Sequence, residues 1–81
     1  MSLDSEFQAA LAHSKSLPGQ PPNIQLKLYG LFKQATQGDV QGKRPGRLEL
    51  RGRAKYDAWA KRSGQTRDEA KQAYIQAISA L

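Results

Sequence analysis

Apolar residues recur every three or four positions in four stretches of this chain, and this helical period is what most limits its fold. The stretches predict helices over residues 3–15, 22–37, 51–62 and 66–81, and no strand pattern competes with them. At 81 residues, the chain is predicted to be one all-α domain, residues 1–81. The residues expected to face inward are Leu3, Phe7, Ala10 and Leu11; Ile24, Leu28, Leu31, Phe32 and Ala35; Ala54, Ala58 and Trp59; and Ala70, Ala73, Tyr74, Ala77, Ile78 and Leu81.

Proline, glycine and capping residues mark the ends of these helices. Three of the four prolines lie between Leu17 and Asn23, which predicts a loop, and Pro22 suits the first position of the second helix. Gly38 is expected to end that helix in a left-handed conformation. Thr66 and Glu69 have the spacing of a capping box, so the last helix is predicted to begin there.

The connection between the second and third helices is unusually long. Four glycines and Pro45 interrupt residues 38–52, and loops of this length are often functional or disordered. Leu48 and Leu50 are expected to pin the connection to the body of the domain. Gly30, inside the second helix, has two interpretations: close packing against a neighbouring helix, or space kept beside something that binds near Tyr29.

The composition argues against most catalytic and metal chemistry. The chain has no cysteine and a single histidine, His13, so thiolate or multi-histidine metal sites are not expected. It contains neither a phosphate-binding GxxxxGK[ST] motif nor GxGxxG, and its acidic residues are scattered singly. We therefore expect no enzyme activity and no cofactor. Without a signal pattern or a membrane-spanning apolar run, a cytoplasmic location is the default expectation.

Charge indicates an anionic partner. Thirteen basic residues against seven acidic ones give a net charge of +6, and the basic residues concentrate between Lys43 and Lys55. Such a cluster can also be a solvated face without a partner. Tyr29, Phe32 and Lys33 are neighbours on one helix, and Arg51 and Lys55 have the same i, i+4 relation on the next. With Tyr74, these residues fit either a nucleotide-like polyanion or a general nucleic-acid surface, and spacing does not separate the two.

A longer pattern includes these residues. The stretch YGLFKQATQGDVQGKRPGRLELRGRAKYDAW has the order Tyr-x-x-aromatic-Lys-Gln-Ala-Thr-x-Gly-Asp, then Arg-Pro-Gly, then basic-Gly-basic-Ala-Lys-aromatic-x-Ala-Trp. It resembles the signature of the acyl-CoA-binding protein family. AYIQAI, at residues 73–78, is similar to the family's last helix, and the region around Phe7 is similar to its first. The resemblance covers nearly the whole chain.

The resemblance implies a four-helix, up-down-down-up bundle that binds one fatty acyl-CoA per chain and does no chemistry on it. It implies no metal, no stable membrane insertion and a monomer. By position, Tyr29, Lys33 and Lys55 correspond to the residues that hold the 3′-phosphate of CoA, and Phe32 and Tyr74 to those beside the adenine. The further basic positions near the ligand are Lys15 and Arg51. The acyl groove and its neighbours correspond to Phe7, Leu11, Leu26, Leu28 and Gly30.

The sequence departs from the family pattern at five positions. Phe32 stands where tyrosine is usual, Arg51 where lysine is usual, and Tyr56 where tryptophan is usual. Gln25 and Lys27 lie where apolar residues are common, which leaves the preferred chain length open. The alternatives to an acyl-CoA carrier are a small basic nucleic-acid-binding module and a protein-interaction module on the same fold. Nucleic acid is the less expected partner, because only the net charge and the basic run favour it.

Overall fold

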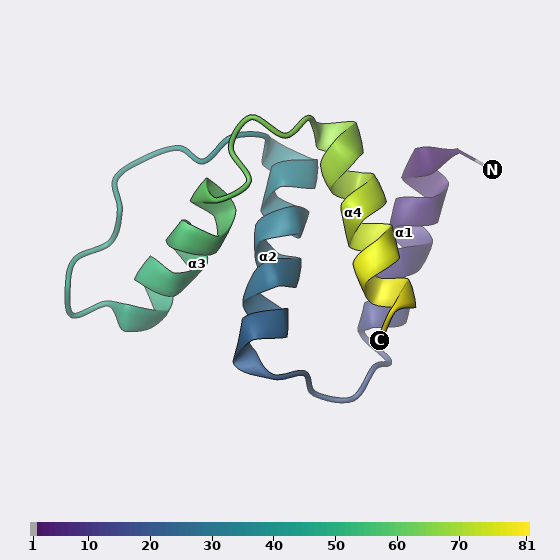
Figure 1. The fold of residues 1–81 in the computed structure, drawn as a ribbon, viewed down its shortest axis with the longest axis horizontal. Coiled ribbons are helices and arrows are strands. Elements are labelled where there is room, and N and C mark those ends of the chain that lie inside the picture. Colours follow the sequence, from purple (N-terminus) through teal and green to yellow (C-terminus); the bar gives the residue numbers. More distant parts are fainter. Residues whose placement is uncertain (1) are drawn as a thin grey trace.

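Four α-helices connected by three loops make up the computed structural model, which describes residues 2–81 (Figure 1). The helices are α1 (Leu3–Ser14), α2 (Pro22–Gln37), α3 (Leu50–Ala60) and α4 (Arg67–Ser79). In Figure 1, α1 and α4 run down the page while α2 and α3 run up it, which is the expected up-down-down-up order. The all-α prediction is therefore confirmed for the described chain.

Local sequence signals explain where the helices begin and end. At α4, the Thr66 hydroxyl accepts a hydrogen bond from the Glu69 amide at 3.0 Å, and the Glu69 carboxylate accepts one from the Thr66 amide at 2.9 Å. Pro22 opens α2, and Gly38 ends it with φ +83° and ψ −151°, a conformation essentially restricted to glycine. The capping box and the proline start are confirmed. Gly38 has the expected positive φ but lies outside the left-handed helical region.

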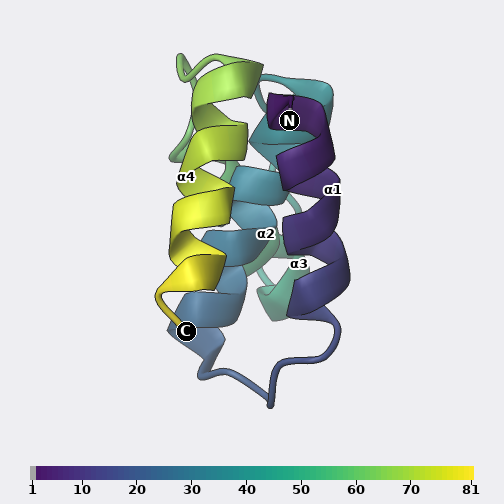
Figure 2. The same ribbon diagram turned by 90° about the vertical axis from the view of Figure 1, so that its right-hand side faces the viewer.

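The hydrophobic core lies between α1, α2 and α4 and excludes α3. Within residues 2–81, α4 packs on both α1 and α2, while α3 packs on α2 alone (Figures 1 and 2). Figure 2 shows α1 and α4 side by side in front of α2. All buried hydrophobic residues of the described chain come from the three core helices: Phe7, Ala10, Leu31, Ala35, Ala70, Tyr74 and Ile78. The inward-facing pattern is thus right for most positions of α1, α2 and α4.

Besides Phe32, which is described with the site below, three apolar positions contradict the sequence expectations. Leu48 is 96% exposed and Leu50 is 73% exposed, so neither pins the long connection to the body. The polar and backbone contacts described below hold the connection instead, which leaves both leucines in solvent. Leu81 lies beyond the end of α4 and is exposed, because α4 ends at Ser79 rather than at the last residue. Similarly, α3 ends at Ala60, two residues earlier than expected.

Hydrogen bonds and one ion pair hold the long connection against α3. The Trp59 indole donates to the Gly38 carbonyl at 2.7 Å, and the Tyr56 hydroxyl donates to the Gly42 carbonyl at 3.0 Å. Arg44 donates two hydrogen bonds to Asp57, at 2.8 and 2.6 Å, and this pairing lowers the pKa of the Asp57 carboxyl. The connection is therefore attached to α3 by specific side-chain contacts along its length.

Candidate functional site

The seam between α2 and α3 brings together the aromatic and basic residues that the sequence singled out. Lys33 on α2 places its Nζ 4.8 Å from the centroid of the Trp59 ring on α3. In the opposite sense, Lys55 on α3 places its Nζ 5.5 Å from the centroid of the Tyr29 ring on α2. Each helix thus contributes a lysine over an aromatic ring of the other. The structure therefore gathers Tyr29, Lys33 and Lys55 into one cluster and adds Trp59, which sequence reasoning had assigned to packing.

Gly30 allows α3 to approach α2 this closely. A Cβ atom added to Gly30 would lie 2.2 Å from the Ala58 carbonyl oxygen, and real Cβ atoms essentially never come so close to another atom. The space beside Gly30 is therefore filled by the α3 backbone. Of the two interpretations of this glycine, close helix packing is the one that the structure bears out. Gly30 sets the distance across which the Tyr29, Lys33 and Lys55 side chains meet.

The two lysines of the cluster are not neutralised by carboxylates. In the described part of the chain, the salt bridges join Arg44 to Asp57 and Lys71 to Asp4. The Lys33 and Lys55 ammonium groups lie instead against ring faces, which attract cations but add no negative charge. Two unpaired ammonium groups beside a phenol hydroxyl are suited to bind a phosphate through charge-assisted hydrogen bonds.

Phe32, Arg51 and Lys15 are solvent-exposed, and Phe32 lies one position before Lys33 on α2. Phe32 is 36% exposed, whereas its neighbour Leu31 is fully buried. The sequence expectation that Phe32 belongs to the buried stripe is wrong, because this side chain is exposed while the neighbouring Leu31 faces the core. Arg51 is exposed in the first turn of α3, and Lys15 is exposed directly after α1. In the described chain, no side-chain hydrogen bond or ion pair joins these three residues to the lysine cluster.

Tyr74 and Phe7 belong to the hydrophobic core and are barely accessible from the surface. Both are buried, and their rings meet edge to face with centroids 5.4 Å apart. Leu11 is half-buried and packs against the same core. Tyr74 nevertheless lines a hollow of about 320 Å³ beside the α1–α2 loop, together with Leu17, Gln25 and Leu28. Tyr74 is only 5% exposed, so it can offer little of its surface to a ligand, and Phe7 packs against its ring in the core.

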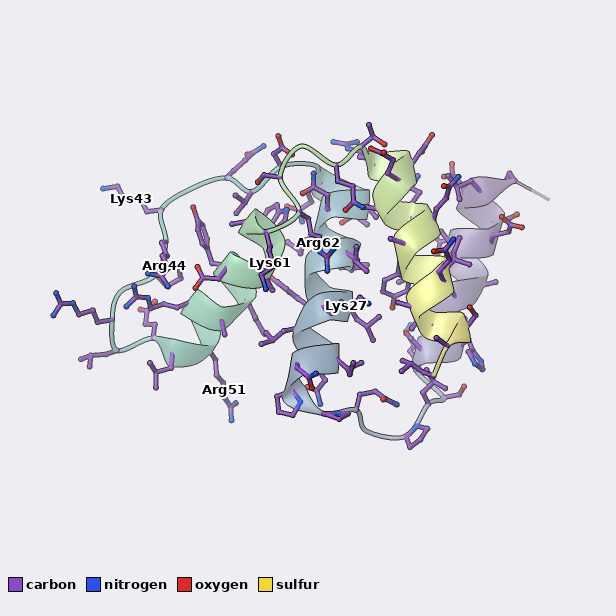
Figure 3. All side chains as sticks on the ribbon, in the orientation of Figure 1. Lys27, Lys43, Arg44, Arg51, Lys61 and Arg62 are labelled. Carbon is purple, nitrogen blue, oxygen red and sulfur yellow. The ribbon has the colours of Figure 1, made fainter. Side chains whose placement is uncertain are left out.

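Leu26 and Leu28 do not line one common groove. Leu28 lines the hollow beside Tyr74, whereas Leu26 lines a second hollow of about 450 Å³ between α2 and α3. Lys27, Lys61 and Arg62 also line this second hollow, and Figure 3 shows them around the α2–α3 seam. Sequence reasoning missed Lys61 and Arg62. The available signal was their spacing of three and four positions from Ala58, although both residues lie just beyond the end of α3 at Ala60.

Residues 2–81 contain neither a metal-ligand cluster nor a helix able to span a membrane. No group of three or more His, Cys, Asp or Glu side chains in these residues is arranged to hold a metal ion. None of the helices described there combines the length and the apolar character that crossing a bilayer requires.

Comparison with known proteins identifies relatives of the whole chain. The family model "Acyl CoA binding protein" matches residues 4–78. An acyl-CoA-binding protein homolog from Manduca sexta is 43% identical over 83 residues, covering 100% of this chain and 92% of the relative. A homolog from Drosophila melanogaster is 41% identical over 80 residues, covering 98% and 93%. The crystal structure of Oryza sativa acyl-CoA-binding protein 2 superposes with a TM-score of 0.95 at 40% identity, covering 99% of this chain and 90% of that one.

Proposed function

The chain belongs to the acyl-CoA-binding protein family, and on that premise we propose that it is a non-catalytic carrier and buffer of medium- and long-chain fatty acyl-CoA thioesters. In this proposal it works in the cytoplasm as a monomer, holds one ligand per chain and needs no cofactor. The carrier shields the acyl chain and the thioester from water until a receiving enzyme or membrane takes them.

The observation that carries the proposal is that two lysines at the α2–α3 seam, Lys33 and Lys55, have no carboxylate partner in the described chain. Lys33 and Lys55 come from two neighbouring helices, and their ammonium groups lie 4.8 and 5.5 Å from the ring centroids of Trp59 and Tyr29, respectively. Together with the Tyr29 hydroxyl they would hold the 3′-phosphate of CoA. A doubly charged phosphate would gain more from this site than a singly charged group, because both ammonium groups can donate to it.

The aromatic and further basic residues would hold the rest of the CoA head. Phe32 is exposed enough to stack on the adenine, and Tyr74 would contribute the edge that lines its hollow. Arg51 and Lys15, both exposed, would add charge toward the remaining phosphates. Phe32 has no hydroxyl, so the adenine would gain stacking there and no hydrogen bond.

The acyl chain would follow the apolar side chains of α2. Leu26 is the candidate in contact with the chain, because it lines the larger hollow with Ala54 and Ala58. Leu28, Leu11 and Phe7 would support the hollow at Tyr74. Each methylene removed from water contributes about 0.8 kcal/mol, so affinity should rise with chain length until the hollow is filled. Lys27, at the rim of the Leu26 hollow, is expected to influence the chain length at which the rise stops.

Calorimetric titration with palmitoyl-CoA, free CoA, palmitate and a short DNA duplex tests the proposal. We expect one site for palmitoyl-CoA and much weaker binding of CoA and palmitate, because each carries only part of the ligand. Binding of DNA alone, with affinity that falls steeply with salt, would favour the nucleic-acid module instead. Binding of none of the four would favour the protein-interaction module.

Variants of the cluster test the phosphate site itself. Lys33→Ala and Lys55→Ala should each weaken palmitoyl-CoA binding by roughly 10- to 100-fold, the usual worth of a charge-assisted hydrogen bond. Tyr29→Phe should weaken it less, since the ring stays. Lys71→Ala is the matched control, because it also removes one lysine charge but lies on the α4 side, paired with Asp4. Equal losses in Lys71→Ala and Lys33→Ala would show that only net charge matters.

A further inference from the structure

Leu48, in the long connection, and Leu50, the first residue of α3, are large apolar residues that lie mostly in solvent. Leu48 is 96% exposed and Leu50 is 73% exposed, the largest exposed fractions among the large hydrophobic residues of the described chain. They alternate with Arg47, Glu49 and Arg51 along the chain, and all five residues are exposed. Large apolar side chains displayed together on a surface usually mark a place where another body binds.

The exposure of these leucines is built into the fold. The Glu49 amide donates to the Gly46 carbonyl at 3.0 Å, which closes a turn with Arg47 and Leu48 at its two central positions. Pro45 packs against Gly52, where an added Cβ would lie 3.4 Å from the proline Cγ. Arg44 is paired with Asp57 two turns further along α3. The turn is therefore held on both sides, and it presents Leu48 at its apex.

The turn lies at one end of the long axis of the molecule. In Figure 1 the connection forms the edge farthest from α1 and α4, so a flat surface can approach it without meeting the core helices. Figure 3 shows basic side chains spread along this edge, with Lys43 above and Arg51 below. Arg44 and Asp57 neutralise each other, which leaves three basic residues, Lys43, Arg47 and Arg51, against one acid, Glu49.

We propose that residues 43–51, the leucine turn, dock the protein reversibly on anionic lipid bilayers. Leu48 and Leu50 enter the boundary between headgroups and acyl chains, while Lys43, Arg47 and Arg51 remain at the level of the lipid phosphates. Neither signal alone gives firm membrane binding, and the turn carries both of them. No spanning helix is needed, which agrees with the absence of one in residues 2–81.

Charge complementarity selects a bilayer over the other occupants of such a surface. A nucleic acid would engage the basic side chains but leave both leucines in water. A second copy of the chain would cover the leucines, but it would bring two sets of like charges together. Of these three occupants, only an anionic bilayer offers apolar contacts and negative charge side by side. Arg51 is shared with the proposed CoA head site, so docking is tested on the chain without a ligand, and the charge variants leave Arg51 in place.

The test is co-sedimentation of the full chain with vesicles in the absence of acyl-CoA. We expect binding to phosphatidylcholine vesicles that contain phosphatidylserine, weaker binding to phosphatidylcholine alone, and loss of binding as salt is raised. The Leu48→Ser/Leu50→Ser double variant should lose at least about tenfold in partition coefficient. Leu81→Ser, another exposed leucine outside the turn, should bind like the parent protein. Lys43→Gln/Arg47→Gln should also lose about tenfold, on the anionic vesicles only.

Circular dichroism checks that each variant remains helical, which is expected because every substituted side chain is exposed. The proposal is overturned if the leucine double variant binds the anionic vesicles as tightly as the parent, since the basic residues would then act alone. It is equally overturned if no vesicle is bound while the leucine turn mediates self-association, measured by sedimentation equilibrium. Binding of DNA in place of vesicles would assign this edge to nucleic acid.

Discussion

The two halves of this molecule are held together by different forces. In the half made by α1, α2 and α4, apolar side chains pack into a core that contains every buried hydrophobic residue of the described chain. The half made by α3 and the long connection contains no buried hydrophobic residue, and α3 packs on α2 alone. The α3 half is held by polar contacts instead of hydrophobic burial. These contacts are the hydrogen bonds donated by Trp59 and Tyr56 and the Arg44–Asp57 ion pair.

This difference separates stability from binding. The lysine cluster and the leucine turn both involve α3 or the connection, where few residues contribute to the core. Substitutions there can change what the protein binds at little cost in folding free energy, whereas substitutions in the core half cannot. Small domains have little stability to lose, so this division gives binding residues room to vary.

The sharpest comparison uses two leucines, one from each half. Leu31 is fully buried, so Leu31→Ala should lower the free energy of unfolding by about 2–5 kcal/mol. Leu48 is almost fully exposed, so Leu48→Ala should change it by no more than about 0.5 kcal/mol. Urea denaturation followed by circular dichroism measures both. Similar losses in the two variants would contradict the division of the molecule into these halves.

The next largest effect is expected where the two halves meet. Gly30→Ala places a Cβ 2.2 Å from the Ala58 carbonyl oxygen, so α3 must move away from α2. We expect a loss of about 1–3 kcal/mol, which outweighs the helix propensity gained from alanine. Gly19→Ala is the control, because nothing lies within 4 Å of its added Cβ. Gly30→Ala should also weaken palmitoyl-CoA binding, since the lysine cluster spans the same seam; a stabilised variant with unchanged affinity would refute this.

A smaller effect should appear in the α3 half alone. Trp59→Phe removes the donor to the Gly38 carbonyl and should cost about 1 kcal/mol. Because this contact ties the connection to α3, amide hydrogen exchange should accelerate in residues 38–49 more than in α1 or α4. Uniform acceleration across the chain would mean that Trp59 belongs energetically to the core half.

The sequence predicted the features that depend on neighbouring residues. Helical periodicity located all four helices to within two residues at each end. The Thr66–Glu69 capping box and the Pro22 start were also predictable, because each needs only residues close in sequence. The pairing of Tyr29, Lys33 and Lys55 came from the family resemblance, since their meeting requires two helices to be aligned.

Features that depend on how helices pack were not predictable in this way. Periodicity placed Phe32 in the buried stripe of α2, but whether a flank is covered depends on where α1 packs. Leu48 and Leu50 were assigned to the body because apolar residues usually are, and no local signal shows that Pro45, Tyr56 and Arg44 already hold the connection. Nor did spacing show that Leu26 and Leu28 would line different hollows.

The smallest expected effect concerns Asp39, which joins the two halves through hydrogen bonds. Its carboxylate accepts from the Gly64 amide at 2.9 Å and from the buried Gln34 side chain at 2.8 Å, and these bonds lower its pKa from the ordinary 3.8. A lowered pKa means that the folded state favours the charged form. The stabilisation is therefore fully present above pH 3.8 and is lost as the pH falls through the lowered pKa.

Asp39→Asn keeps an oxygen that can accept both bonds but removes the titrating charge. The variant should melt slightly below the parent at neutral pH and lose less of its melting temperature on acidification below about pH 4. Some acid sensitivity should remain, because Asp57 and Glu69 also have lowered pKa values, from Arg44 and from the Thr66 amide. Thermal melts across this pH range measure the difference. Parallel pH profiles would show that Asp39 joins the α3 half to the core through geometry alone, and that its charge is dispensable.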